Sequence, residues 1–187
     1  MSKRVLLAVL CCAAAFVSAR AQAPTASEEL KALVEANQAD RELDWSKFSP
    51  QDMEAINARD RQRRERVLEI VRTQQPASAD DYFHAAMILQ HGDAPEHFLL
   101  AHVLANVAAF KGHKTGKWLS AAALDRYLAS LKQDQFFGTQ FFSEGLAFEN
   151  LQLKPPLNGL VTDALRKEFN VPPPEETLKR WKESQGK

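Results

Sequence analysis

Apolar residues recur at helical spacing along most of the chain, which predicts a fold built almost entirely from helices. A helix is expected over residues 50–73, where Ser49 supplies an N-cap hydroxyl and Pro50 the first helical position. Its apolar positions share one face: Met53, Ile56, Val67, Ile70 and Val71. An earlier helix is expected from Thr25 or Ser27, because Thr25 and Glu28 have the spacing of a capping box.

Further helices follow in the second half of the chain. The pattern predicts them over residues 80–91, 93–111, 117–132 and 161–169, with a last short helix after the three prolines at 172–174. In the helix over 93–111 we expect Asp93 to be the N-cap. Because this helix is apolar nearly all round, we also expect it to lie at the centre of the bundle.

The predicted fold class is all-α. We expect residues 22–187 to form one domain, a bundle of antiparallel helical hairpins with six or seven helices. The hydrophobic pattern changes after Gly138: apolar residues lie among polar ones up to Pro155-Pro156. A small extended or hairpin segment is therefore expected near residues 140–155.

The first residues are typical of a bacterial signal peptide. Lys3 and Arg4 precede an apolar run over 5–17, and Ala19-Arg20-Ala21 fits the small-x-small cleavage pattern. We expect residues 1–21 to be removed after Ala21, or after Ala19 as the alternative. This predicts a periplasmic or secreted protein with no membrane insertion after cleavage.

Cysteine use and charge narrow the classes of function. Cys11 and Cys12 both lie in the apolar run and lack the pattern of a lipid-modified cysteine, so the mature chain is expected to have neither disulfide nor thiol chemistry. Cleavage also removes three basic residues and no acid, which leaves a net charge of −3. Such a chain has no global positive field for nucleic acid, so we expect no nucleic-acid partner.

Charged residues crowd the middle of the helix over 50–73. Five arginines and two acids lie within residues 59–66. One interpretation is a solvent-exposed helix surface with many ion pairs. The alternative is a patch that binds an anion or an acidic partner, because the arginines outnumber the acids.

Several polar residues interrupt the apolar helices between Asp81 and Phe142. They are Gln90-His91, Asp125-Arg126 and Gly138-Thr139-Gln140, the last held between pairs of phenylalanines. Polar groups beside apolar helix faces are costly unless they find partners, so we expect Gln90, His91, Asp125, Arg126 and Gln140 to form one cluster.

Each part of this cluster has a structural and a functional interpretation. His91 either caps its own helix, where the helix dipole favours imidazolium, or transfers protons in a cleft. Asp125 and Arg126 either tie their helix to the next segment through a structural ion pair or line a pocket. Asp125 needs a cationic or N–H partner there, and we expect Arg126, His91 and the Gln140 amide to supply it. Gln140 either satisfies loop backbone groups or recognises a ligand. The candidate ligand-binding residues are thus Gln90, His91, Asp125, Arg126, Thr139 and Gln140.

Metal and cofactor chemistry are not expected. His84 and His91 are seven residues apart, which separates their backbones by roughly 10 Å along a helix. His97 and His102 point about 140° apart on a helix, so neither pair can hold one ion. The chain also lacks the sequence signatures of common secreted hydrolases.

The ordered set of Gln90-His91, Asp125-Arg126, and Gln135 followed by Phe137-Gly138-Thr139-Gln140 resembles a bacterial family of uncharacterised helical domains. Phe137 stands where that family usually has tyrosine, so any role of a phenol is lost here. The resemblance covers residues 81–142, with a looser similarity at Leu153-Lys154-Pro155 and in the helix that contains Arg166. It implies a helical domain with a shared polar site, and it implies no particular activity.

Two functions remain open at this point. The leading hypothesis is an exported binding or interaction module for an unknown small molecule or protein. The alternative is a small hydrolase-like enzyme, in which His91 is the base and Arg126 and Gln140 hold an oxyanion, with Asp125 as a further candidate.

Export predicts a specific N-terminus. Intact-mass measurement on protein from a bacterial envelope fraction should give a chain that starts at Gln22 or Arg20. Recovery of chains that begin at Met1 in the soluble cytosolic fraction would contradict the prediction.

Overall fold

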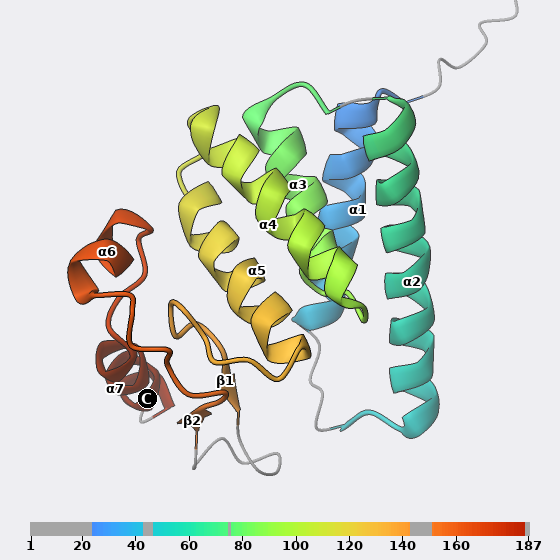
Figure 1. The fold of residues 1–187 in the computed structure, drawn as a ribbon. Helices are drawn as coiled ribbons and strands as arrows, with labels where there is room; N and C mark the ends of the chain where they lie inside the picture. The colour runs from blue at the N-terminus through green and yellow to red at the C-terminus, as the bar shows by residue number, and fades with distance from the viewer. Residues whose placement is uncertain (1–23, 43–46, 75, 143–150, 186–187) are drawn as a thin grey trace, which may run out of the picture.

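The computed structural model describes residues 24–42, 47–74, 76–142 and 151–185. In these ranges seven helices and one two-stranded sheet form an all-α domain with a small hairpin (Figure 1). The helices are α1 (Ala26–Arg41), α2 (Pro50–Thr73), α3 (Ala79–Leu89), α4 (Pro95–Phe110), α5 (Gly116–Ser130), α6 (Asp163–Glu168) and α7 (Pro174–Gln185). The predicted signal segment, with both cysteines, lies outside the described residues.

Helix starts follow the capping signals closely. Thr25, Ser49 and Ser78 each accept a hydrogen bond from the backbone N–H three residues later, and each is the first member of a complete capping box. The prediction for α4 is wrong: Ala94 occupies its N-cap and makes no side-chain bond. The Asp93 carboxylate instead accepts a hydrogen bond from Arg64 of α2.

Helices α1 to α5 pack as consecutive antiparallel neighbours around one apolar core (Figure 1). All five helices contribute to it, through residues such as Leu30, Val67, Leu89, Leu104 and Leu119. Helices α4 and α5 approach each other closely at Gly116. A Cβ at this position would lie 2.7 Å from the Ala109 nitrogen, so the absence of a side chain permits the approach. A smaller apolar cluster joins α5 to the C-terminal segment.

Helix α4 does not lie at the centre of the bundle, so that expectation is wrong. It packs against α3 and α5 on one side only. Its opposite side exposes Leu99, Val103 and Phe110, and the Phe110 side chain is 88% exposed. The apolar composition of α4 therefore exceeds what its two neighbours can cover.

The arginine-rich part of α2 ties helices together. Arg59 and Arg63 donate to Asp40 of α1, and Arg66 pairs with Glu29 of α1. The hydrogen bonds from Arg59, followed by those from Arg63, lower the pKa of Asp40 to about 2. Ion pairs were expected here, but the surface is not simply solvated, because Arg63 is buried between α1 and α2.

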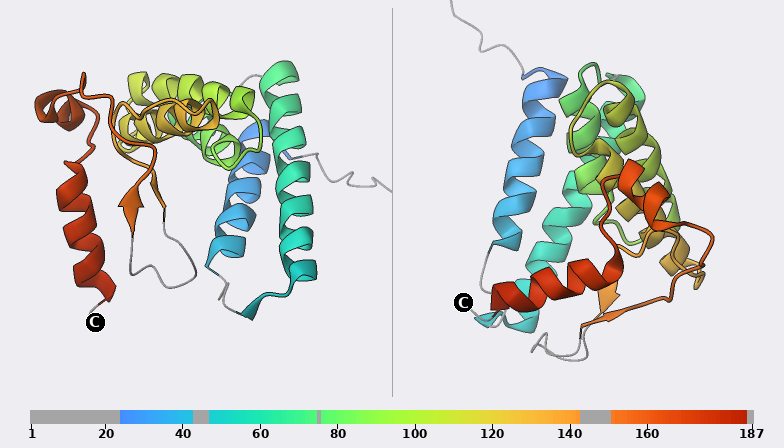
Figure 2. Two further views of the ribbon diagram at one scale, coloured as in Figure 1. Left: turned by 60° about the horizontal axis from the view of Figure 1, so that its bottom comes forward. Right: turned by 90° about the vertical axis from the view of Figure 1, so that its left-hand side faces the viewer.

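The hairpin lies beside the C-terminal end of α5 (Figure 2). Strand β1 (Phe141–Phe142) pairs antiparallel with β2 (Gln152–Leu153), with Phe141 opposite Leu153. Residues 143–150, the remainder of the predicted extended segment, lie outside the described residues. Gly138 precedes β1 with φ +74°, and a Cβ there would lie 2.9 Å from Pro174 Cγ, so only glycine fits without strain.

Candidate functional site

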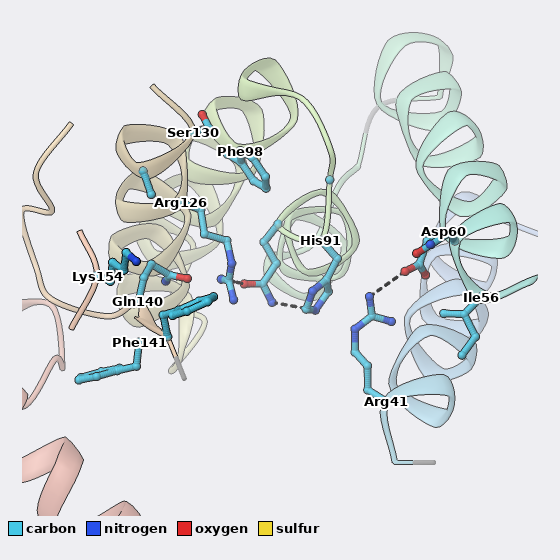
Figure 3. Close-up of a pocket in the computed structure, with 15 residues that line it drawn as sticks. Arg41, Ile56, Asp60, His91, Phe98, Arg126, Ser130, Gln140, Phe141 and Lys154 are labelled. Carbon is cyan, nitrogen blue, oxygen red and sulfur yellow. Dashed lines mark hydrogen bonds and ion pairs between the residues drawn. The ribbon is translucent and has the colours of Figure 1, made fainter. Parts of the chain in front are cut away.

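A pocket of about 590 Å³ opens between the lower ends of α1 and α2, the α3–α4 loop, the end of α5 and the hairpin (Figure 3). Its volume lies in the range of small-molecule sites, roughly 300–1,000 Å³. The lining residues are Arg41, Ile56, Asn57 and Asp60; Gln90, His91, Gly92 and Phe98; Arg126, Ala129 and Ser130; and Gln140, Phe141, Phe142 and Lys154.

The pocket brings together four of the residues that the sequence singles out. Gln90, His91, Arg126 and Gln140 come from three separate segments and all line it. Asp125 and Thr139 do not line it. They lie behind the wall and hold the segment that carries Gln140.

Gln90 lines the pocket and connects Arg126 to His91, both of which are labelled in Figure 3. The Arg126 guanidinium donates through Nη1 to Gln90 Oε1 at 2.5 Å. The other end of the amide, Gln90 Nε2, lies 3.4 Å from His91 Nε2 and 2.8 Å from Met87 Sδ. Because Arg126 fixes the amide oxygen, the amino group faces His91 Nε2, and the network assigns the imidazole proton to Nδ1.

Asp125 is fully buried, and its partners differ from those expected. Its carboxylate accepts from the backbone N–H groups of Phe136, Phe137 and Thr139 at 2.8, 3.0 and 2.9 Å, and from the Thr139 hydroxyl at 2.8 Å. The expected partners Arg126, His91 and Gln140 make no hydrogen bond to it. The loop backbone satisfies this carboxylate, so its role is to fix the loop on α5.

The same loop orients Gln140. Gln140 Nε2 donates to the Thr139 hydroxyl at 2.8 Å and to the Ala122 carbonyl at 3.3 Å, which leaves the amide oxygen toward the pocket (Figure 3). Buried Gln135 closes the turn: its Oε1 accepts from Gln140 N, and its Nε2 donates to the carbonyls of Gln140 and Pro155. Gln135 therefore performs the loop-satisfying role that one interpretation gave to Gln140.

On the opposite wall, Arg41 and Asp60 form an ion pair at 2.9 Å. Asp60 also accepts from Asn37 and Arg63, so it belongs both to the pocket and to the network between α1 and α2. Arg64 donates to the His91 carbonyl at 3.2 Å and holds the α3–α4 loop from behind.

The electrostatic environment keeps His91 neutral. Burial, followed by the positive charges of Arg41 and Arg126, lowers the pKa of His91 to about 3. This is opposite to the imidazolium that the helix dipole favours, and the His91 side chain does not cap its helix. Burial and Arg41 also lower the pKa of Arg126, which still remains protonated as arginine does in proteins.

Metal-ligating groups do not gather at this site. Within the described ranges, no three His, Cys, Asp or Glu side chains lie close enough to hold one ion. The one hydroxyl at the pocket wall, that of Ser130, donates to the Tyr127 carbonyl at 2.6 Å. No helix among residues 24–42, 47–74, 76–142 and 151–185 is both long and apolar enough to cross a membrane.

Comparisons of the chain with protein-family models, with curated proteins and with solved structures found no match.

Sequence reasoning missed one complete wall of the pocket. Arg41 and Asp60 carry no motif, and their position depends on how α1 and α2 meet. The sequence showed that Phe141-Phe142 follows Gly138-Thr139-Gln140. It did not indicate that these two aromatic side chains line a pocket. Phe98 and Lys154 were not predicted to belong to a site.

Removal of the Asp125 carboxylate should destabilise the domain. Asp125→Ala leaves three backbone N–H groups without their acceptor, and we expect a loss of about 3–5 kcal/mol. For a chain of this length that corresponds to a fall in Tm of roughly 10 °C. Asp163→Ala is the matched control, because the Asp163 side chain is 69% exposed and its pair with Arg166 is worth about 1 kcal/mol or less. Equal melting of the two variants would contradict the assigned role.

The depressed pKa of His91 predicts a loss of stability in mild acid. The unfolded imidazole titrates near 6.5 and the folded one near 3, so between these values the unfolded chain binds more protons. Stability is therefore complete above pH 6.5 and falls as the pH drops toward 3, by about 2 kcal/mol between pH 7 and pH 5. Burial lowers the pKa of His84 as well, which adds a decrease of the same sign.

Urea denaturation at pH 7 and pH 5 measures this effect. His91→Gln should lose less stability than the wild type between the two values, because glutamine does not titrate. Asp40 is no complication there, since its carboxyl stays ionised with a pKa near 2. An identical change in both proteins would show that His91 is not held neutral.

Proposed function

We propose that the chain is an exported binding module whose pocket takes a small organic anion. The observation that carries the proposal is the state of Arg126. Its guanidinium lines the pocket and, within the described chain, its hydrogen-bond partner is the neutral Gln90 amide and not a carboxylate. A partly buried cation without a counter-ion is costly, and an anionic ligand would remove that cost.

The other groups of the pocket support the same ligand. Arg41 adds a second guanidinium across the cavity, although Asp60 already pairs with it. His91 Nδ1 has no hydrogen-bond partner among the described residues, and in the assigned tautomer it is a donor. Donors thus predominate on the floor of the pocket, which favours a ligand that accepts hydrogen bonds.

Export is part of the proposal. The basic start, apolar run and Ala-x-Ala motif at the N-terminus support a periplasmic or secreted location in a bacterium. The expected mature charge of −3 gives no support for a nucleic-acid partner. A small ligand in the pocket is preferred over a protein partner because the uncompensated charge lies inside a cavity.

The hydrolase alternative is less well supported. A general base is most effective when its pKa lies near the working pH, and the pKa of His91 is about 3. The Nε2 of His91 also faces the Gln90 amino group. Ser130 directs its proton to the Tyr127 carbonyl, so the hydroxyl found among the described lining residues is not activated as a nucleophile.

Calorimetric titration can test the proposal on the mature chain. We expect phenylacetate or phenyl phosphate to bind the wild type, and their neutral relative phenylacetamide to bind at least tenfold more weakly. Arg126→Met should weaken anion binding at least tenfold, because a charged hydrogen bond is worth about 1.5–3 kcal/mol.

Lys117→Met is the matched control for this test, since Lys117 lies on the same helix, is exposed and is remote from the pocket. It should leave binding unchanged. Failure of both anions to bind, or equal affinity for phenylacetamide, would refute anion binding.

A further inference from the structure

The pocket contains one deep positive charge, that of Arg126, which makes no ion pair with a carboxylate among the described residues. The buried Asp125 carboxylate acts on it only through space. Four of its lining residues are charged: Arg41, Asp60, Arg126 and Lys154. Arg41 pairs with Asp60 at 2.9 Å, and Asp60 pairs with Arg63 as well. Lys154 is exposed on the hairpin, where its Nζ lies 4.9 Å from the centre of the Phe142 ring and remains in contact with water. Among the described lining residues, Arg126 is therefore the charged group that is largely buried and has no ion-pair partner.

The neighbours of Arg126 supply hydrogen bonds without further charge. Gln90 is neutral, and His91 stays neutral because burial and the two arginines lower its pKa to about 3. A dianion such as a phosphate monoester would bring a second negative charge into a partly buried site where, among the described residues, Arg126 is the one deep cation without an ion-pair partner. A monoanion matches that one guanidinium.

The shape of the Arg126 guanidinium group also favours a monoanion, and in particular a carboxylate. Its planar fork matches a carboxylate through two parallel N–H···O bonds. One Arg126 nitrogen, Nη1, is already used by Gln90, which fixes the plane of the group and leaves the rest of the fork for a ligand.

Apolar side chains form much of the remaining wall. Ile56 comes from α2, Phe98 from α4, and Phe141 and Phe142 from β1 (Figure 3). Neither a bare inorganic anion nor acetate would contact these groups from a position on Arg126. A ligand that covers them needs an apolar body attached to its anionic end.

We infer that the ligand is a monocarboxylate with an aromatic or aliphatic body, whose carboxylate binds Arg126 while its body packs against Phe98, Phe141 and Phe142. This inference rests on the proposed function, and it adds the charge and the shape of the ligand. Gln90 is the positioning residue, since it holds Arg126 and His91 in place through an uncharged group.

The test compares four probes by calorimetric titration at pH 7.5: phenylacetate, acetate, phenyl phosphate and inorganic phosphate. Phenylacetate should bind at least tenfold more tightly than each of the other three. Phenyl phosphate of equal or higher affinity would overturn the inference while leaving anion binding intact. Equal affinity for acetate would overturn the role of the apolar wall. No binding of any probe would refute the proposed function, and the inference with it.

A second variant tests the site without removal of Arg126. Gln90→Glu places a carboxylate where Gln90 Oε1 now accepts from Arg126, at 2.5 Å. The variant should fold and melt at or above the wild-type temperature, because a new ion pair replaces a neutral hydrogen bond. It should also lose at least tenfold in phenylacetate affinity, since the new carboxylate competes for the guanidinium. Unchanged affinity in the folded variant would overturn the assignment of Arg126 as the anion site.

Discussion

The geometry of the pocket depends above all on the buried carboxylate of Asp125. A carboxyl group with no exposure to water must be fully hydrogen-bonded, and the partners available here are the backbone N–H groups of a loop. Satisfying Asp125 therefore fixes residues 136–139 against α5. The position of Gln140, the start of β1 and the aromatic wall follow from that one requirement. Gln135 completes the arrangement of the loop through hydrogen bonds to the backbone of Gln140 and of Pro155.

A second constraint acts on the other side of the pocket. The contact between α1 and α2 is partly ionic, with Asp40 and Asp60 shared among Arg41, Arg59 and Arg63. Removal of either acid would leave guanidinium groups between α1 and α2 without an ion-pair partner, where water reaches them poorly. Because Asp60 is also a pocket residue, the stability of this helix pair and the charge of the cavity are not independent.

Local sequence signals predicted the helices well. The capping residues Thr25, Ser49 and Ser78 are decisive because an N-cap bond forms between residues three apart and needs no tertiary information. Asp93 shows the limit of such signals. It has the right spacing for an N-cap, but Arg64 from another helix binds its carboxylate. The exposed face of α4 shows the same limit, since composition does not say how many neighbours a helix will have.

The candidate site was predictable only in part. The energetic cost of polar groups in apolar helices correctly indicated that Gln90, His91 and Arg126 lie together. The partners of Asp125 could not be foreseen, because backbone N–H groups are present at every residue except proline and leave no trace in composition. Arg41 could not be foreseen either, since it reaches the pocket only through the packing of the C-terminal end of α1 beside α2.

The position of the pocket between two pairs of helices has a consequence for stability. Arg41 ends α1 and Arg126 lies on α5, and the helix contacts of α2 are mainly with α1 and α3. A ligand bound at Arg126 that fills the pocket would touch both the α1–α2 pair, through Ile56, and the α4–α5 pair, through Phe98 and Arg126. Occupancy would then stabilise the folded domain by an amount that grows with the logarithm of the ligand concentration.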